Sequence, residues 1–195
     1  LDVMERQVRH LSRLVDDLLD VSRITRGRIE LHRQVLEIAE PIGRAVERCS
    51  ALLEERGHGL VLDVPRSGLT VDGDLERLAQ VVTHLLANAA CYTPDGGRVE
   101  VRADGSDDTV RVRVRDDGPG IPDDVAAHAF ELFVQGIRTL DRKGGGLGLG
   151  LPIVRSLTEL HGGTAAVTQT GSGGTEVTVT LPRAHIGSEA SAVPR

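Results

Sequence analysis

The sequence predicts an α+β fold, a two-layer α/β sandwich in which helices cover one face of a mixed, mostly antiparallel sheet, preceded by one long helix. Two kinds of pattern lead to this prediction. Apolar residues at steps of three and four are typical of amphipathic helices, and alternating apolar and polar residues are typical of half-exposed strands. The alternating stretches come in neighbouring pairs joined by short turns, which favours hairpins, and the helical stretches supply one covering layer.

The chain opens on the long helix, which we expect to end at residues 25–28. Apolar residues recur in it with the spacing of a helix that pairs along a stripe: Met4, Val8, Leu11, Val15 and Leu18. Further apolar residues widen the stripe, as in a four-helix bundle. We expect this helix to pair with a second copy of the chain and with a helix upstream of Leu1. Packing against the chain's own domain is the alternative.

The other elements follow in order along the chain. We expect helices at 38–56, 75–91 and about 152–160, and strands at 29–36, 60–64, 69–72, 98–103, 109–115, 164–170 and 175–181. Asp72 or Asp74 is placed to cap the helix that starts at Leu75. Residues after Pro182 have the composition of a flexible tail or linker.

Composition excludes several classes of protein. The net charge of −6 argues against a dedicated nucleic-acid binder, which usually has a basic face. No apolar run reaches the roughly 18 residues that a membrane-spanning helix needs. We therefore expect membrane attachment, if any, only through regions outside this chain. Cys49 and Cys91 lack the spacing of a metal or redox motif, which favours reduced thiols and a cytoplasmic location.

A glycine-rich segment precedes the last predicted helix. Gly146, Gly148 and Gly150 alternate with leucines, so bare backbone amides can face a ligand while the leucines pack inward. Pro152 suits the first turn of a helix, and the N–H groups at a helix N-terminus favour phosphate. Lys143 precedes the glycines, which excludes a P-loop, and the glycine spacing excludes a dinucleotide-binding motif. A flexible linker or a simple helix cap is the alternative.

Two further motifs carry polar groups at places where chemistry is expected. Asp116 ends a predicted strand beside Gly118 and Gly120, so its carboxylate can accept a hydrogen bond from an amine while a flat base lies against the glycines. Asn88 lies among apolar residues of the helix at 75–91, one turn after His84. A buried amide needs a partner, and Mg²⁺ bound to phosphates would be one. An ordinary Asp-Gly turn and an asparagine bonded to local backbone are the alternatives.

Together these motifs resemble the N, G1, F and G2 boxes of sensor histidine kinases: Asn88 in its helix, Asp116-x-Gly118-x-Gly120, Phe130-Glu131-Leu132-Phe133 and Gly146-x-Gly148-x-Gly150. Their order resembles the Bergerat-type ATP-binding fold shared with gyrase, mismatch-repair and heat-shock chaperone ATPases. The opening helix resembles the second helix of the kinases' dimerisation domain. The resemblance implies three parts: a dimerisation helix at 1–27, an ATP-binding catalytic domain at 28–183, and a flexible tail or linker at 184–195.

The resemblance also implies roles for single residues. Asn88 would bind Mg²⁺, Asp116 would read the adenine amino group with help from the Thr175 hydroxyl or a water, and Tyr92 would flank the base. Residues 134–145 would form a lid anchored by Phe130 and Phe133. Arg142 and Lys143 in that lid would reach the γ-phosphate. The implied contacts with ATP are Asn88, Tyr92, Asp116, Gly118, Gly120, Ile121, Gly146, Leu147, Gly148, Leu149, Gly150 and Thr175.

The activity implied by the resemblance is transfer of the ATP γ-phosphoryl to a histidine within a homodimer, followed by relay to an aspartate on a response-regulator receiver domain. The sequence departs from the family pattern at Cys91, where a basic residue is usual. No histidine here has the context of the phosphoacceptor, so we expect that residue upstream of Leu1. An ATP-hydrolysing clamp of the same superfamily, or a degenerate module that binds nucleotide and dimerises, is the alternative. A clamp would use a glutamate where His84 stands.

Overall fold

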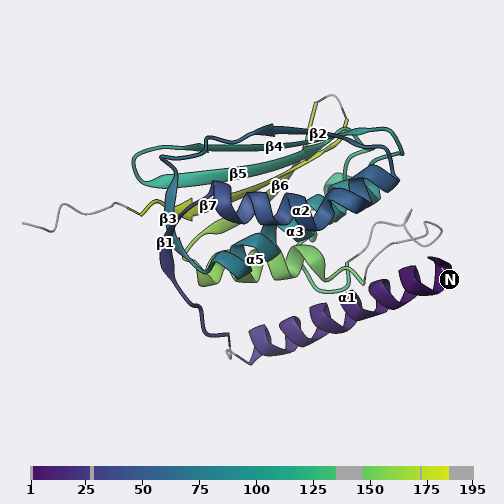
Figure 1. Ribbon diagram of the computed structural model, residues 1–195, viewed down its shortest axis with the longest axis horizontal. Helices are drawn as coiled ribbons and strands as arrows, with labels where there is room; N and C mark the ends of the chain where they lie inside the picture. Colours follow the sequence, from purple (N-terminus) through teal and green to yellow (C-terminus); the bar gives the residue numbers. More distant parts are fainter. Residues whose placement is uncertain (1, 27–28, 135–146, 172, 185–195) are drawn as a thin grey trace, which may run out of the picture.

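The computed structural model describes residues 2–26, 29–134, 147–171 and 173–184. Its main sheet has five strands in the order β2-β4-β5-β7-β6 (Figure 1). Their bounds are β2 Gly59–Asp63, β4 Arg98–Gly105, β5 Thr109–Asp116, β6 Thr164–Gln169 and β7 Thr175–Pro182. Only β2 and β4 run parallel, and the other neighbours are antiparallel. The predicted mixed, mostly antiparallel sheet with its two hairpins is therefore confirmed.

Three helices cover one face of this sheet, α2 (Ala39–Glu55), α3 (Leu75–Tyr92) and α5 (Gly150–Leu160), which confirms the predicted two layers (Figure 1). A short helix, α4 (Asp123–Ala126), follows β5. The core between the layers is almost wholly aliphatic, as the low aromatic content requires. Its fully buried side chains include Leu85, Leu86, Val99, Val101, Val112, Ile153 and Leu157.

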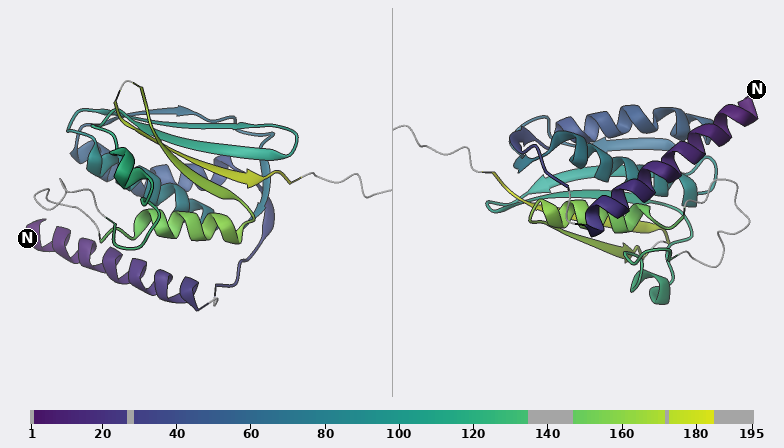
Figure 2. Two further views of the ribbon diagram at one scale, coloured as in Figure 1. Left: turned by 180° about the vertical axis from the view of Figure 1, so that it is seen from behind. Right: turned by 90° about the horizontal axis from the view of Figure 1, so that it is seen from below.

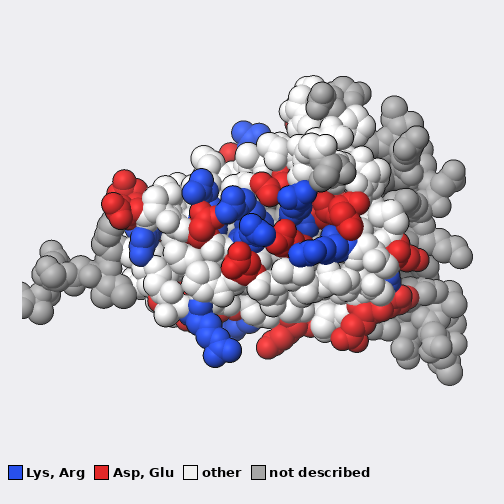
Figure 3. Space-filling view, turned by 90° about the horizontal axis from the view of Figure 1, so that it is seen from above, with Lys and Arg blue, Asp and Glu red and all other residues white. Residues whose placement is uncertain are grey.

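The opposite face of the sheet carries charged residues that pair across and along the strands (Figure 3). Asp104 on β4 accepts hydrogen bonds from Arg111 and Arg113 on β5, and Arg102 donates to Glu100 on the same strand. Each of these pairs joins side chains of opposite charge, from exposed to partly buried. They account for the alternation of apolar and charged residues in the sequence, since every second residue points away from the core.

The strand predicted at 29–36 is shorter in the structure and lies outside the main sheet. β1 spans Gln34–Glu37 and pairs antiparallel with β3 (Thr70–Gly73) as a separate two-stranded sheet. The preceding residues are held by other contacts. The His32 N–H donates to the Asp74 side chain at 2.9 Å, and the Arg33 guanidinium donates to the Leu160 carbonyl at 2.6 Å. Single hydrogen bonds to the start of α3 and the end of α5 therefore hold this stretch, and no strand ladder does.

Helix α1 (Asp2–Thr25) runs along the outer side of the helix layer (Figure 2). The described residues of the predicted stripe remain exposed, namely Val8, Leu11, Val15 and Leu18. The alternative in which this stripe packs against the chain's own domain is therefore wrong. Val21, on another face of the helix, packs against the core. Among the described helices, none is both long and apolar enough to cross a membrane.

Candidate functional site

Helix α3 is fixed at its start by Asp74, which settles which of the two predicted aspartates caps it. Asp74 Oδ1 accepts hydrogen bonds from the N–H groups of Glu76 (3.0 Å) and Arg77 (3.1 Å), and Oδ2 accepts from His32. Burial alone would raise the pKa of Asp74, but these backbone donors outweigh it, and the pKa lies below its usual value. The cap aligns a helix whose last turns carry Asn88.

The Asn88 side chain lies against the first residue of α5. A Cβ built on Gly150 would stand 3.5 Å from both Asn88 Oδ1 and Nδ2, and 3.6 Å from Nδ1 of His84. The expected proximity of His84 and Asn88 is thus confirmed. The N-cap residue of α5, Leu149, makes no side-chain hydrogen bond to the helix. The first-turn N–H groups of α5, which lie near Asn88, therefore lack a side-chain cap. Such an N-terminus favours an anion.

His84 lies between α1 and this end of α5. Its Nε2 is 3.6 Å from Asp17 Oδ1 on α1. Burial lowers the pKa of His84, while the Asp17 and Asp20 carboxylates act in the opposite direction.

Asp116 ends β5 with its side chain almost fully buried. Its Oδ1 accepts hydrogen bonds from the N–H groups of Gly118 (2.9 Å) and Thr175 (3.3 Å). Burial raises the pKa of the Asp116 carboxyl, and the two backbone donors partly oppose that rise. Within the described part of the chain no donor is bonded to Oδ2, which leaves one oxygen of this carboxylate for a ligand.

The neighbouring Asp117 has a different role, because its side chain accepts a hydrogen bond from the Arg98 N–H at 2.8 Å and so ties the turn to β4. Close backbone packing explains the glycine beside it. A Cβ on Gly118 would lie 2.8 Å from Asp116 Oδ1 and 3.1 Å from the Tyr92 carbonyl. This packing brings the end of α3 against the Asp116 turn, so both predicted motifs belong to one region.

Other predicted contacts lie around that turn. Thr175 is buried, and the contact with Asp116 runs through its backbone N–H rather than its hydroxyl. The Tyr92 side chain is 38% exposed, and partial burial raises its pKa. Ile121 is partly buried beside the turn. A Cβ on Gly120 would meet the amide of Gln169 on β6 at 2.8 Å, a neighbour that the sequence did not predict.

The glycine-rich segment is described from Leu147 onward. Gly148 has φ +74, and a Cβ there would lie 2.8 Å from the Val134 carbonyl, so the described residues on either side of 135–146 lie close together. Leu149 is buried, as expected, but Leu147 is exposed, so the prediction that the leucines of this segment pack inward is wrong for Leu147. Arg142, Lys143 and Gly146 lie outside the described residues.

Of the two phenylalanines expected to pack against the core and anchor the lid, only one does so in the described structure. Phe130 packs against the core. Phe133 does not, because its side chain is 63% exposed. Its backbone has φ +65 and packs against Gly148, which turns the side chain away from the core. The prediction for Phe133 is therefore wrong.

The sequence analysis also missed two contacts that shape the site. His161 is buried and its Nε2 accepts a hydrogen bond from the Asp74 N–H at 3.0 Å, joining the end of α5 to the start of α3. A Cβ on Gly174 would lie 2.1 Å from the Asp116 carbonyl, so the β6–β7 turn packs on the Asp116 turn. The adjacent glycines before Thr175 were a usable signal of that close approach. Nothing in the local sequence gives the partner of His161.

Within the described ranges, no three His, Cys, Asp or Glu side chains are grouped so that they could hold a metal ion. Carboxylate, amide and phosphate oxygens are the ligands that Mg²⁺ prefers.

Comparisons with known proteins identify the family to which this arrangement belongs. Residues 73–185, more than half of the chain, match the family described as histidine kinase-, DNA gyrase B- and HSP90-like ATPases. The histidine protein kinase DivJ of Caulobacter vibrioides is 36% identical over 89% of this chain and 29% of its own length. The signal transduction histidine-protein kinase BaeS of Escherichia coli is 33% identical over 92% of this chain and 38% of its own. The chain spans well under half the length of such relatives.

Solved structures agree. The mycobacterial sensor histidine kinase MprB has a TM-score of 0.68 at 31% identity, covering 77% of this chain and 98% of that one. Full-length ShkA in complex with AMPPNP has a TM-score of 0.76 at 32% identity, covering 90% of this chain and 36% of that one. The chain therefore belongs to the family of histidine kinase-, DNA gyrase B- and HSP90-like ATPases, and it carries the ATP-binding catalytic domain of a sensor histidine kinase.

Proposed function

We propose that this chain transfers the γ-phosphoryl group of ATP to a histidine on a dimerisation helix, for relay to an aspartate of a response-regulator receiver domain. The observation that carries the proposal is the convergence of Asp116, Asn88 and the uncapped start of α5 at one end of the helix layer. The similarity to ShkA, whose structure holds the ATP analogue AMPPNP, supports the same ligand. The three parts at 1–27, 28–183 and 184–195 belong to this proposal.

The residues present fit an adenine nucleotide with Mg²⁺. The free Oδ2 of buried Asp116 suits the adenine amino group, and Gly118 allows the end of α3 to pack closely against the Asp116 turn. Beside Asn88, Gly150 leaves room at a helix N-terminus where phosphates are favoured. Asn88 would supply an amide oxygen to Mg²⁺, and Tyr92 and Ile121 would flank the base. Thr175 would act through Asp116, whose carboxylate its N–H holds in place.

Phosphoryl transfer depends mainly on positioning and charge neutralisation. The bound Mg²⁺ would neutralise part of the phosphate charge. The chain itself would orient the nucleotide through the Asp116 turn at one end and the amides from Leu147 to Gly150 at the other. Arg142 and Lys143 are proposed to add positive charge at the γ-phosphate, and Lys143 would offset the absence of a basic residue at Cys91.

The position of His84 favours transfer over hydrolysis. A hydrolysing clamp needs a base one helical turn before the asparagine to activate water. The only residue at that place is His84, and its Nε2 faces Asp17 of α1 while Nδ1 faces Gly150. The glutamate that a hydrolysing clamp would use is therefore replaced by a histidine that faces a carboxylate of α1, an arrangement unlike that of a clamp.

The test combines this chain with a separately produced upstream helix that bears the acceptor histidine, together with Mg²⁺ and ATP labelled at the γ-phosphate. Acid-labile label on the helix supports the kinase, free phosphate alone supports the clamp, and binding without either supports a regulatory module. Asp116→Asn should lower transfer at least about tenfold, because it places an N–H donor where an acceptor is needed. Asp117→Asn is the matched control, since Asp117 contacts only the Arg98 backbone in the described contacts, and it should retain transfer.

A further inference from the structure

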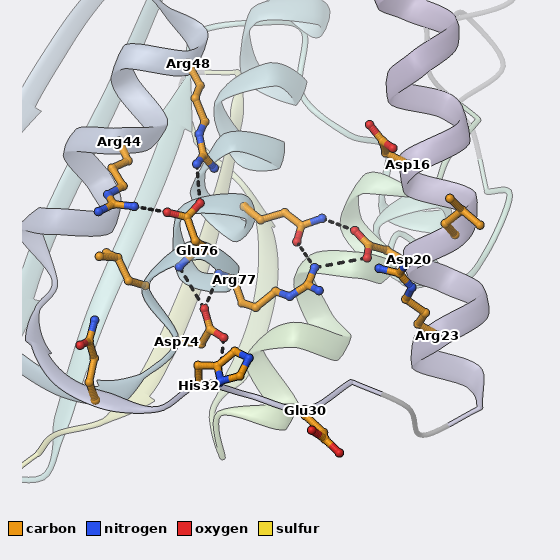
Figure 4. Close-up of a pocket in the computed structure, with 14 residues that line it drawn as sticks. Asp16, Asp20, Arg23, Glu30, His32, Arg44, Arg48, Asp74, Glu76 and Arg77 are labelled. Atoms are coloured by element: carbon orange, nitrogen blue, oxygen red, sulfur yellow. Dashed lines mark hydrogen bonds and ion pairs between the residues drawn. The ribbon is translucent and has the colours of Figure 1, made fainter.

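Helix α1 is held against α3 by polar side chains rather than by its apolar stripe. Asp20 on α1 accepts a hydrogen bond from Arg77 Nη1 at 3.2 Å and another from Gln80 Nε2 at 2.5 Å (Figure 4). Arg77 also donates to Gln80 Oε1 at 2.9 Å, so the three side chains form one connected group. Asp20 is only 8% exposed, which makes this pair less screened by solvent than a surface ion pair.

A second contact lies one turn earlier on α1, where Asp17 faces His84. His84 in turn lies beside Gly150 and Asn88, at the proposed phosphate end of the nucleotide site. The contacts between α1 and α3 thus extend from Asp20 to His84, which lies next to that site. We call Asp17, Asp20, Arg77, Gln80 and His84 the α1–α3 contact.

Besides the α1–α3 contact, Val21 of α1 packs against the core and α1 also contacts α5. Beside the α1–α3 contact lies an open cavity of about 760 Å³, bounded by charged residues of α1, α2 and α3 that include Asp16, Arg23, Arg44 and Glu76 (Figure 4). Arg44 and Glu76 pair with each other across it and not with α1. The exposed apolar stripe of α1 takes no part in this docking, and the strength of the polar α1–α3 contact depends on charge.

We infer that the α1–α3 contact is a releasable docking of α1 that a nucleotide triphosphate weakens. The physical reason is like charge. A triphosphate keeps a net negative charge when one Mg²⁺ is bound, so phosphates beside Asn88 and Gly150 would add negative charge near the Asp17 carboxylate, on the other side of the His84 ring. Asp20 lies one turn further along α1. By linkage, the same repulsion lowers the affinity for the triphosphate while α1 is docked. This second part rests on the proposed nucleotide site.

The experiment measures hydrogen exchange of the α1 amides in the whole chain, with β5 amides as the measure of intact folding. Asp20→Asn should speed α1 exchange at least about tenfold, because Arg77 then loses its charged partner. Asp16→Asn is the matched control, since Asp16 carries the same charge on the same helix but makes no contact with α3 among the described residues, and it should leave exchange unchanged. Equal exchange in both variants and the wild type would overturn the docking contact.

Nucleotide coupling is tested with AMPPNP and Mg²⁺, and with adenosine as the uncharged probe. AMPPNP should speed α1 exchange and adenosine should not, while Asp17→Asn should bind AMPPNP several-fold more tightly than the wild type. If AMPPNP binds, but α1 exchange is unchanged and Asp17→Asn binds AMPPNP no more tightly than the wild type, the coupling is wrong and the nucleotide site stands. If AMPPNP does not bind at all, the proposed function fails, and the comparison of Asp20→Asn with Asp16→Asn still decides the docking contact.

Discussion

At the scale of single residues, Asp116 sets the chemistry of the proposed base contact. Its Oδ1 is committed to two backbone N–H groups, so recognition rests on Oδ2 and on the charge of the carboxylate. Burial raises the pKa of Asp116, which means that the carboxylate takes up a proton at a higher pH than an exposed aspartate does. A protonated Asp116 is a weaker acceptor for an adenine amino group.

We therefore expect adenosine affinity to fall on acidification, starting above the pH at which an ordinary aspartate titrates. Adenosine is the suitable ligand because it has no phosphate whose own titration would imitate the effect. Binding is followed by NMR titration between neutral and mildly acidic pH. In Asp116→Asn the affinity should be low at every pH and lose this dependence. A pH profile that is the same in the wild type and in Asp116→Asn would show that Asp116 does not read the base.

Predictions for single residues succeeded where the neighbouring residues in the sequence already marked the position as unusual. Asp116 and Asn88 stood out because a polar side chain beside glycines, or among apolar helix positions, needs a reason. Phe133 failed because its orientation depends on a positive φ and on packing with Gly148, which lies 15 residues further along the chain. The contact of His161 with Asp74 spans 87 residues, and no local pattern signals such a partner.

At the scale of elements, the start of α3 is held by the Asp74 cap. Replacing Asp74 by alanine removes the acceptor for Glu76, Arg77 and His32 at once. We expect the free energy of unfolding to fall by about 1–2 kcal/mol, the usual cost of losing a helix cap. Asp72→Ala is the control, because Asp72 is exposed and makes only a 3.6 Å ion pair with Arg33. Urea unfolding of the two variants should separate them clearly, and equal losses would contradict the assigned cap.

The junction of α3 and α5 should make stability depend on pH through His161. Its Nε2 accepts a hydrogen bond from Asp74, while the Leu157 carbonyl lies 2.7 Å from Nδ1, so the ring is neutral with the proton on Nδ1. Burial lowers the pKa of His161, an effect that outweighs the opposing Leu157 carbonyl. A charged ring would direct a second N–H at the Asp74 N–H and lose that bond.

The sign follows from linkage. Because the folded pKa lies below the unfolded value of 6.5, the unfolded chain takes up the proton first as pH falls. The contribution of His161 to stability is complete above pH 6.5 and is lost progressively below it, down to the folded pKa. In His161→Gln the unfolding free energy should be lower at neutral pH and decline less between neutral and mildly acidic pH. An unchanged decline, measured by urea unfolding, would assign the effect to other groups.

Most elements were predictable because each has one face buried in the core, which gives its sequence a regular spacing of apolar residues. The helices α2, α3 and α5 and the two hairpins follow the 3.6- and two-residue periods that a two-layer fold imposes. The segment before β1 was mispredicted because its backbone pairs with no strand before Gln34. It is fixed by single hydrogen bonds to α3 and α5, and such tethers leave no periodic trace.

At the scale of the whole molecule, α1 has two faces with different partners. One face carries Asp17, Asp20 and Val21 toward the catalytic domain. The other carries Val8, Leu11, Val15 and Leu18, each at least half exposed. Soluble proteins rarely leave so regular an apolar stripe to water without a partner. The spacing of four and three is that of helices packed along their length, which supports the proposed homodimer.

We accordingly expect the chain to self-associate through this stripe. Burying four such side chains per copy contributes about 1.5–3 kcal/mol for each side chain, before the cost of association is subtracted. Leu11→Asp places a charge in the middle of the stripe and should weaken association at least about tenfold in sedimentation equilibrium. Leu62→Asp is the control, because Leu62 on β2 is also half exposed but lies on the edge of the sheet, away from α1. Since the stripe faces away from α3, adenosine affinity should be equal in both variants. If association survives Leu11→Asp, or if Leu62→Asp weakens it as much, the interface does not lie on the apolar stripe of α1.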